Sequence, residues 1–185
     1  MLLEKTLFQV DVLTLQIRFG PETAARLKQV ARGDEDSEAR EDSIVSAALD
    51  ARDAFVRAEF LRSVDLDRFI ESTRTNLRRA REAGIISPDA YRRISNGLPR
   101  WYDFLEERGI RAGDEILYRI RGDTLRSVYR TAEGGVPLDV THTGRERRLS
   151  VVGSYLAPAS DFRKDLLRSI FRSESRCKTG QEAGT

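Results

Sequence analysis

Residues 7–19 show the alternation of apolar and polar positions that predicts a β-strand. The apolar phase changes partway, because Val10 and Val12 share one parity whereas Leu13 and Leu15 share the other. A β-bulge near Val12 and Leu13, or burial of both faces of the strand, explains such a change. The sequence therefore predicts one long strand with an irregularity in its middle.

Four further segments alternate in the same way and complete a set of strands. They cover residues 54–62, 116–120, 125–129 and 136–141. The last three follow Gly113-Asp114, and the Gly122-Asp123 dipeptide between two of them is typical of a two-residue hairpin turn. Pro137 cannot donate a backbone hydrogen bond, which favours an edge position for the last strand. We expect an antiparallel meander here.

Apolar residues at helical spacing predict helices around these strands. The predicted helices cover residues 21–30, 65–83, 87–95, 99–108 and 160–171, with Asn96-Gly97 interrupting the helical pattern before Pro99 restarts it. Residues 33–43 lack apolar periodicity and predict an exposed acidic loop, and residues 173–185 predict a disordered tail. This order of elements predicts one α+β domain over residues 1–172.

Charge and cysteine content narrow the class of protein. The 185-residue chain has 32 basic and 30 acidic residues, with a formal net charge of +2, so both signs should mix on its surface. Only four basic residues are lysines; arginine suits phosphate and carboxylate recognition, but the interleaved acids favour an ion-paired surface over nucleic-acid binding. The single cysteine, Cys177, cannot form an internal disulfide, so we expect the reducing cytoplasm. No apolar run approaches the roughly 20 residues of a membrane span.

The patterns of common catalytic and cofactor sites are absent from the sequence. The only histidine, His142, falls in a predicted turn, and we expect it to be a solvent-exposed loop residue. Val152-Gly153-Ser154-Tyr155-Leu156 lacks the second glycine of a nucleophile elbow. Neither a phosphate-binding glycine loop nor a Cys/His metal spacing occurs. We therefore expect no metal and no cofactor.

A polar pair on the predicted helix after Asp65 is the best candidate for ligand contact. Seven residues are close to two helical turns, so Asn76 lies on the face of Phe69 together with Thr73. A buried amide needs partners, which are either backbone groups or a ligand in a cavity. Thr73 and Asn76 are thus candidate ligand-binding residues, with a purely structural role as the alternative.

Charged and aromatic residues on the predicted strands form a second set of candidates. Asp11 has apolar neighbours on both sides and could be an edge carboxylate or a group in a cleft. Arg18, Tyr118 and Arg148 could project toward an anionic ligand, or could be surface ion-pair or half-buried residues. Asp11 and Arg18 are therefore weaker candidate ligand-binding residues.

The order of elements resembles that of the chalcone isomerase-like family, in a divergent, bacterial-type form. The likeness covers residues 54–171 and rests on the strand at 54–62, the run from Phe60 to Phe69 (FLRSVDLDRF), the helical block, and Gly113-Asp114 followed by hairpins. The resemblance implies an open-faced β-sandwich, in which an antiparallel sheet carries a helical layer on one face with a cleft between them. Some members close the ring of a chalcone, and others bind fatty acids without catalysis.

Carrying over the functional residues of the plant enzymes gives one match among four. Those enzymes use an arginine and a threonine on early strands, and a tyrosine and an asparagine on the following helix. Asn76 matches the asparagine, whereas Phe69 stands where the tyrosine would be, Asp11 falls near the threonine, and the arginine would precede Met1. A carboxylate at the threonine position would oppose the anion that forms during ring closure.

The resemblance therefore implies a domain that binds a hydrophobic small molecule or fatty acid without chalcone cyclisation. An isomerase, or intramolecular lyase, acting on an unknown substrate is the first alternative. A protein-interaction module that uses an exposed sheet edge is the second.

Overall fold

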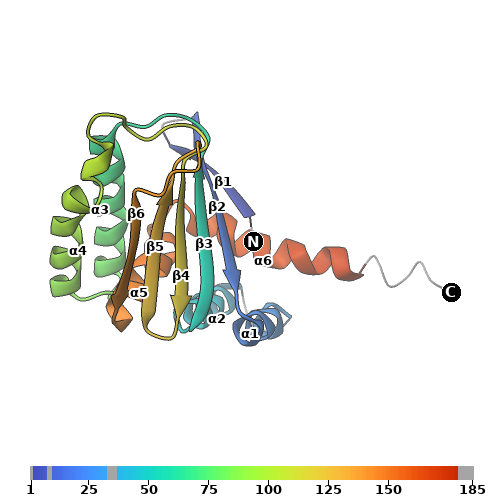
Figure 1. Ribbon diagram of the computed structural model, residues 1–185. Helices are drawn as coiled ribbons and strands as arrows, with labels where there is room; N and C mark the ends of the chain where they lie inside the picture. Colours follow the sequence, from blue (N-terminus) through green and yellow to red (C-terminus); the bar gives the residue numbers. More distant parts are fainter. Residues whose placement is uncertain (1, 8–9, 33–36, 179–185) are drawn as a thin grey trace.

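Six antiparallel strands form one sheet in which each strand pairs with its neighbours in the sequence (Figure 1). The computed structural model describes the backbone of residues 2–7, 10–32 and 37–178, and the side chains of residues 12–32 and 38–170. The strands are β1 (Leu2–Leu7), β2 (Val10–Phe19), β3 (Asp53–Phe60), β4 (Glu115–Arg121), β5 (Thr124–Arg130) and β6 (Leu138–Thr143). The predicted strands from β3 onward are confirmed. The predicted strand 7–19 corresponds to β2, with residues 8–9 outside the described part, whereas β1 was not predicted.

Helices fill the connections on either side of β3 and follow β6. They are α1 (Pro21–Ala31), α2 (Ser37–Leu49), α3 (Leu66–Glu82), α4 (Pro88–Trp101), α5 (Arg145–Leu156) and α6 (Arg163–Lys178), with a short 3-10 turn, η1, at Asp103–Leu105. In Figure 1, α3 and α4 lie side by side next to the sheet, while α1 and α2 lie at one end of it.

The irregularity expected in the first strand is a bulge at Val12. Lys5 pairs with Leu13, but Thr6 pairs with Asp11, so that Val12 has no partner across the β1–β2 ladder. Val12 and Leu15 are both buried although they differ in parity. The bulge thus explains the change of phase, because the extra residue turns the following side chains to the other face.

One face of the sheet is apolar and covered by helices. On β3 the buried residues Ala54, Val56, Ala58 and Phe60 alternate with half-buried polar or aromatic ones. Residues aligned with them on β2 and β4 continue this apolar face, as shown by the pairing of Ala58 with Leu15 and Ile116. The helices α3, α4 and α5 pack against this face, so the predicted open-faced sandwich is confirmed.

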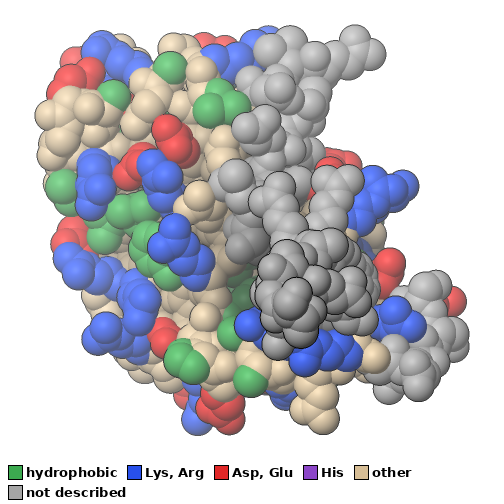
Figure 2. Space-filling model, turned by 90° about the vertical axis from the view of Figure 1, so that its right-hand side faces the viewer, with side chains coloured by type: hydrophobic (Ala, Val, Ile, Leu, Met, Phe, Trp, Pro, Cys, Tyr) green, Lys and Arg blue, Asp and Glu red, His purple; other side chains and the backbone are tan. Residues whose placement is uncertain are grey.

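The other face of the sheet carries ion pairs. Arg57 bonds Glu115 across β3 and β4, Arg119 lies 3.0 Å from Asp53, and a pair between β5 and β6 joins Arg126 to Asp139. Figure 2 shows basic and acidic side chains interleaved over one side of the molecule, with small groups of hydrophobic residues between them. The expected surface of mixed sign is present on this side of the molecule.

A buried carboxylate fixes the start of β4. Asp114 is fully buried and accepts hydrogen bonds from the Arg108 guanidinium (2.8 Å), the Tyr129 hydroxyl (2.6 Å) and the backbone amides of Arg111 (2.9 Å) and Ala132 (3.0 Å). Burial opposes ionisation, but these donors outweigh it and lower the pKa of Asp114 to about 2. The Gly113-Asp114 motif therefore ties the helical block to the hairpins.

Two predictions, about a loop and about the C-terminal tail, are wrong. Residues 37–43, predicted as loop, belong to α2, whose Ile44, Ala47 and Ala48 are buried in the core. Acidic side chains in the first turn of a helix interact favourably with the positive end of the helix dipole, so they stabilise α2. The predicted disordered tail is helical up to Lys178, because α6 continues that far. Residues 33–36 and 179–185 lie outside the described part.

The predicted interruption at Asn96-Gly97 is also absent, because α4 is one continuous helix with Pro99 inside it. Proline lacks the amide that would bond the carbonyl of Ser95. That carbonyl accepts instead from the Arg74 guanidinium of α3, at 3.4 Å. A contact between helices thus compensates for the proline.

Candidate ligand-binding cavity

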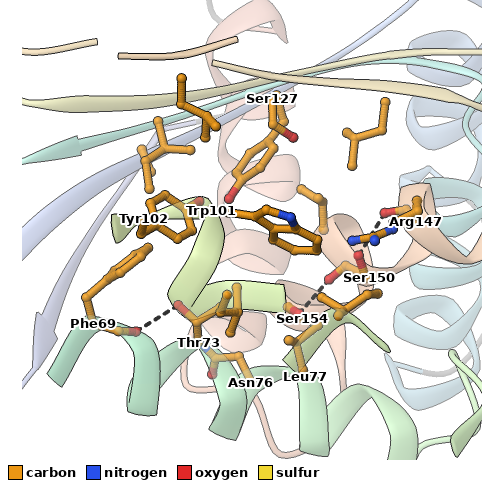
Figure 3. A pocket seen from close by; sticks show the side chains of 18 of the residues that line it. Phe69, Thr73, Asn76, Leu77, Trp101, Tyr102, Ser127, Arg147, Ser150 and Ser154 are labelled. Atoms are coloured by element: carbon orange, nitrogen blue, oxygen red, sulfur yellow. Dashed lines mark hydrogen bonds between the residues drawn. The ribbon is translucent and has the colours of Figure 1, made fainter. Parts of the chain in front are cut away.

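A cavity of about 110 Å³ lies between the sheet and the helices α3, α4 and α5. We call it the inner cavity. The sheet lines it with Ala58, Tyr118, Ser127 and His142, and the helices line it with Leu77, Trp101, Tyr102, Arg147 and Ser154, among others. Figure 3 shows the Trp101 indole between the Ser127 side of the sheet and Leu77 of α3.

A larger depression of about 1060 Å³, the outer groove, lies next to the inner cavity along α3. It reaches Arg62, Arg108 and Ile110 on the far side. Leu13, Phe60, Phe69, Thr73, Asn76 and Tyr155 line both spaces, and we call these six residues the neck. An apolar cavity of about 150 Å³ accepts a molecule the size of benzene, so a longer ligand in the inner cavity must extend through the neck.

Thr73 and Asn76 both lie at the neck, as their helical spacing predicts. The Thr73 hydroxyl donates to the carbonyl of Phe69 at 2.8 Å, and the Asn76 carbonyl oxygen accepts from Arg79 at 3.4 Å. Each residue therefore retains a group that a ligand could use: Thr73 its acceptor lone pairs, and Asn76 its amide donors.

The two candidates on the first strands differ from this pair. Arg18 is exposed, and it alternates with the buried Leu15 and Ile17, so it lies on the face opposite the inner cavity. Arg18 therefore does not line the inner cavity, because successive side chains of a strand point to opposite faces of the sheet. The backbone of Asp11 belongs to β2, but its side chain lies outside the described part.

Three tyrosines give the cavity wall its hydroxyl groups. Burial raises the pKa of Tyr102 to about 12, although a hydrogen bond with Tyr118 partly offsets the effect. Burial also raises the pKa of Tyr118 and that of Tyr155 well above the usual value. All three phenols are neutral at physiological pH, and the Tyr118 hydroxyl already donates to that of Tyr102. Phe69 lacks a phenol, as predicted, but these residues bring phenols from α4, β4 and α5.

A stack of three residues closes the end of the inner cavity away from the neck. The rings of Trp101 and His142 lie 5.5 Å apart, and the Arg147 guanidinium lies 4.5 Å from the centre of the Trp101 ring. His142 belongs to β6 and is half-buried, so its predicted place in an exposed turn is wrong. Desolvation lowers its pKa, and the nearby Arg147 adds to that effect.

Arg148, which follows Arg147 on α5, has a structural role. Its side chain is only 4% exposed, and its guanidinium donates to the carbonyls of Leu49 at 2.5 Å and Ala51 at 3.0 Å. It therefore ties α5 to the segment between α2 and β3, and it does not line the cavity.

Metal ligands and membrane spans are not found in the parts of the chain that the structure covers. Within the described ranges, no three His, Cys, Asp or Glu side chains gather in a way that could hold a metal ion. Among the described helices, none combines the length and the hydrophobicity needed to cross a bilayer.

The sequence matches no family model and no curated protein. The structure is similar to the crystal structure of a fatty-acid binding protein of Arabidopsis thaliana, with a TM-score of 0.60 at 12% sequence identity, over 92% of this chain and 85% of that chain. The fold is that of the chalcone isomerase-like family. The likeness covers more of the chain than residues 54–171, on which the sequence resemblance rested.

Within the chalcone isomerase-like fold, the helix-and-sheet cleft implied by the resemblance corresponds to the inner cavity and the outer groove. Sequence reasoning found Asn76 and Thr73 there through helical periodicity. It missed Trp101, His142 and Arg147, which come from α4, β6 and α5. The only signal for them in the sequence is the basic cluster of Arg145, Arg147 and Arg148 after Gly144. The sequence does not reveal that Arg147 faces the cavity.

Proposed function

We propose that the protein binds an elongated hydrophobic small molecule, of the fatty-acid type, in the inner cavity and the outer groove, without chalcone cyclisation. The observation that carries the proposal is that the inner cavity and the outer groove border each other at the neck beside Asn76 and share its six lining residues. Solid packing of α3 on the sheet would have left no room for a ligand. The similar fold of the Arabidopsis fatty-acid binding protein supports the same function.

The lining of the cavity suits such a ligand. Its walls are mainly aliphatic and aromatic side chains, with a few polar groups at separate points. This combination is typical of small-molecule sites, in which apolar area provides affinity and a few hydrogen bonds fix the orientation. The outer groove is large enough for the greater part of a long chain. Its lining is more polar than that of the inner cavity and includes charged residues such as Asp65 and Glu71.

The test uses Trp101, the only tryptophan of the chain, as an internal reporter. Titration with fatty acids of increasing chain length should change its fluorescence, and calorimetry should give one binding site. Native mass spectrometry of the protein purified from its own host should show a bound lipid. The absence of both a fluorescence change and binding heat with every acid would refute the proposal. A stoichiometric protein partner would favour the interaction module.

Ser127→Phe fills the inner cavity and provides the matched variant. Ser127 is buried on β5 and lines the cavity, so a phenyl ring there should abolish the fluorescence response. Val128→Phe places the same ring on the next residue, which the alternation of β5 directs to the open face, and should bind as the unmodified protein does. If Ser127→Phe lowers the melting temperature strongly, Ser127→Leu repeats the test with a smaller side chain.

An isomerase acting on another substrate is the second candidate, and the three neutral phenols favour it. Tyr102, Tyr118 and Tyr155 could donate hydrogen bonds to an enolate or phenolate as it forms. We expect that chalcone cyclises no faster with the protein than it does spontaneously. A rate above it that Tyr118→Phe removes would establish catalysis instead.

A further inference from the structure

Arg147 is a half-buried cation for which the described residues supply no carboxylate. It is the third residue of α5 and lines the inner cavity. The neighbouring cations differ, because Arg93 lies 3.3 Å from Glu146, and Arg148 donates to two backbone carbonyls. Desolvation lowers the pKa of Arg147, and Arg93 lowers it further. A partly buried charge without a counterion is unfavourable, so the site is suited to an anion from outside the chain.

The contacts of Arg147 leave its donors available. The guanidinium lies over the Trp101 ring, 4.5 Å from its centre, and within the described residues its N–H groups have no hydrogen-bond acceptor. Figure 3 shows Arg147, Ser150 and Ser154 along the cavity side of α5. The two serine hydroxyls donate to carbonyls of their own helix, at 2.8 and 2.5 Å, so their protons are already engaged.

Gly97 makes this arrangement possible. A Cβ atom at that position would lie 2.6 Å from the Trp101 ring, so only glycine lets the indole lie against the α4 backbone. The indole is thereby directed toward the cavity, where it contacts both the guanidinium and the His142 ring. The stack is therefore built from three separate elements of the fold.

Most cations at the opposite end are already paired. In the outer groove, Arg79 lies 2.9 Å from Asp161, and Arg108 lies 2.8 Å from Asp114. Arg62 is the exception, because its buried Nε atom has no hydrogen-bond partner among the described residues. Arg62 is thus the rival position for an anion, and it would hold the ligand in the groove alone.

We propose that Arg147 recognises the carboxylate of the ligand, so that the headgroup lies at the Trp101–His142 end and the chain runs through the neck into the outer groove. This inference rests on the proposed function and specifies the ligand class as a carboxylic acid bound headgroup-first. A planar guanidinium can hold both oxygens of a carboxylate at once. The aliphatic chain would then pass the apolar side of the neck, where Phe60, Phe69 and Leu13 line its path.

The test compares decanoic acid with decanol and methyl decanoate, which share the chain but carry no charge. The unmodified protein should bind the acid roughly tenfold more tightly than either, which is the size expected for charge-assisted hydrogen bonds. Arg147→Gln should remove this preference while leaving the affinity for decanol unchanged. Arg147→Lys keeps the charge without the planar fork and should retain part of the preference.

Two matched variants complete the design. Arg145→Gln removes an exposed cation two residues away and should leave the preference intact. Arg62→Gln tests the rival position and should also leave it intact. Because Arg147→Gln removes an uncompensated charge, its melting temperature without ligand should be unchanged or higher, which separates a binding effect from unfolding.

The outcomes distinguish this inference from the proposed function. A preference for the acid that survives Arg147→Gln, or that Arg62→Gln abolishes, would overturn the assignment of Arg147. Equal affinity of the unmodified protein for acid and decanol would refute the inference and leave the binding function standing. Failure to bind any of the three compounds would refute both.

Discussion

The Trp101 indole lies against the backbone of Gly97, four residues earlier on α4, so closely that a Cβ atom on Gly97 would be 2.6 Å from the ring. Glycine inside a helix normally costs stability because it gains conformational freedom on unfolding. Here the small residue fixes the direction of the only tryptophan, and with it the wall of the inner cavity.

We predict that Gly97→Ala displaces the indole. Glycine to alanine in a helix should by itself stabilise the protein by roughly 1 kcal/mol, but the overlap with the ring should cancel this gain. The Trp101 emission should shift to longer wavelength as the ring becomes more exposed, and fatty-acid binding should weaken. Asn96→Ala, at the exposed neighbouring position, is the control and should change neither property. An unchanged spectrum in Gly97→Ala would contradict the packing described here.

The same pair shows why the sequence predicted this region only partly. Asn96-Gly97 and Pro99 have the pattern of a helix break, yet packing on Trp101 and the Arg74 bond to the Ser95 carbonyl keep α4 continuous. Local propensity was overridden by contacts between elements distant in the sequence. Asn76, by contrast, was predictable because its place depends only on the period of its own helix.

The Arg147 stack could not be predicted for a related reason. Its members belong to α4, β6 and α5, and their meeting depends on the order of the strands and on how α5 packs on β5. Arg147 and Arg148 are adjacent in sequence and identical in type, but a turn of 100° per residue gives them different surroundings. The sequence marks the cluster, and only the fold distinguishes the two arginines.

Arg148 should be a stability residue and not a binding residue. Arg148→Met would leave the buried carbonyls of Leu49 and Ala51 without the donor that they have now, and we expect a loss of about 3 kcal/mol in the free energy of unfolding. Denaturant titration measures this loss. Arg145→Met, at an exposed position of the same helix, should cost little. A loss of ligand affinity without loss of stability in Arg148→Met would contradict this assignment.

Asp114 should make the protein sensitive to acid. Its pKa is about 2 in the folded protein and 3.8 in the reference state, so the folded state favours the ionised form. The resulting stability, about 2 kcal/mol, is present above pH 3.8 and is lost as the pH falls toward 2. The free energy of unfolding of Asp114→Asn, measured between pH 6 and pH 2, should lack this part of the pH dependence.

The control for Asp114 is Asp139, whose pKa is lowered by its hydrogen bonds with Arg126 on the open face of the sheet. Exposed ion pairs contribute little to stability, so Asp139→Asn should leave the acid profile almost unchanged. Asp114→Asn should in addition be destabilised at pH 7, because it keeps the Arg108 guanidinium beside a neutral group. Equal acid profiles for Asp114→Asn and the unmodified protein would show that the carboxylate is not the group responsible.

The buried tyrosines should have the opposite effect, at high pH. The pKa of Tyr102 is raised to about 12, and that of Tyr118 is raised as well. A phenol whose pKa is higher in the folded state stabilises that state fully below its unfolded pKa of about 10, and this contribution is lost as the pH rises through the folded value. Absorbance titration should therefore show tyrosinate forming late, together with unfolding, whereas Tyr118→Phe should lose one of the late-titrating phenols. Tyrosinate formation near pH 10 in the folded protein that Tyr118→Phe removes would mean that this hydroxyl reaches water. Because the phenols remain neutral below that range, any change in fatty-acid affinity between pH 7 and pH 9 must come from groups other than Tyr102 and Tyr118.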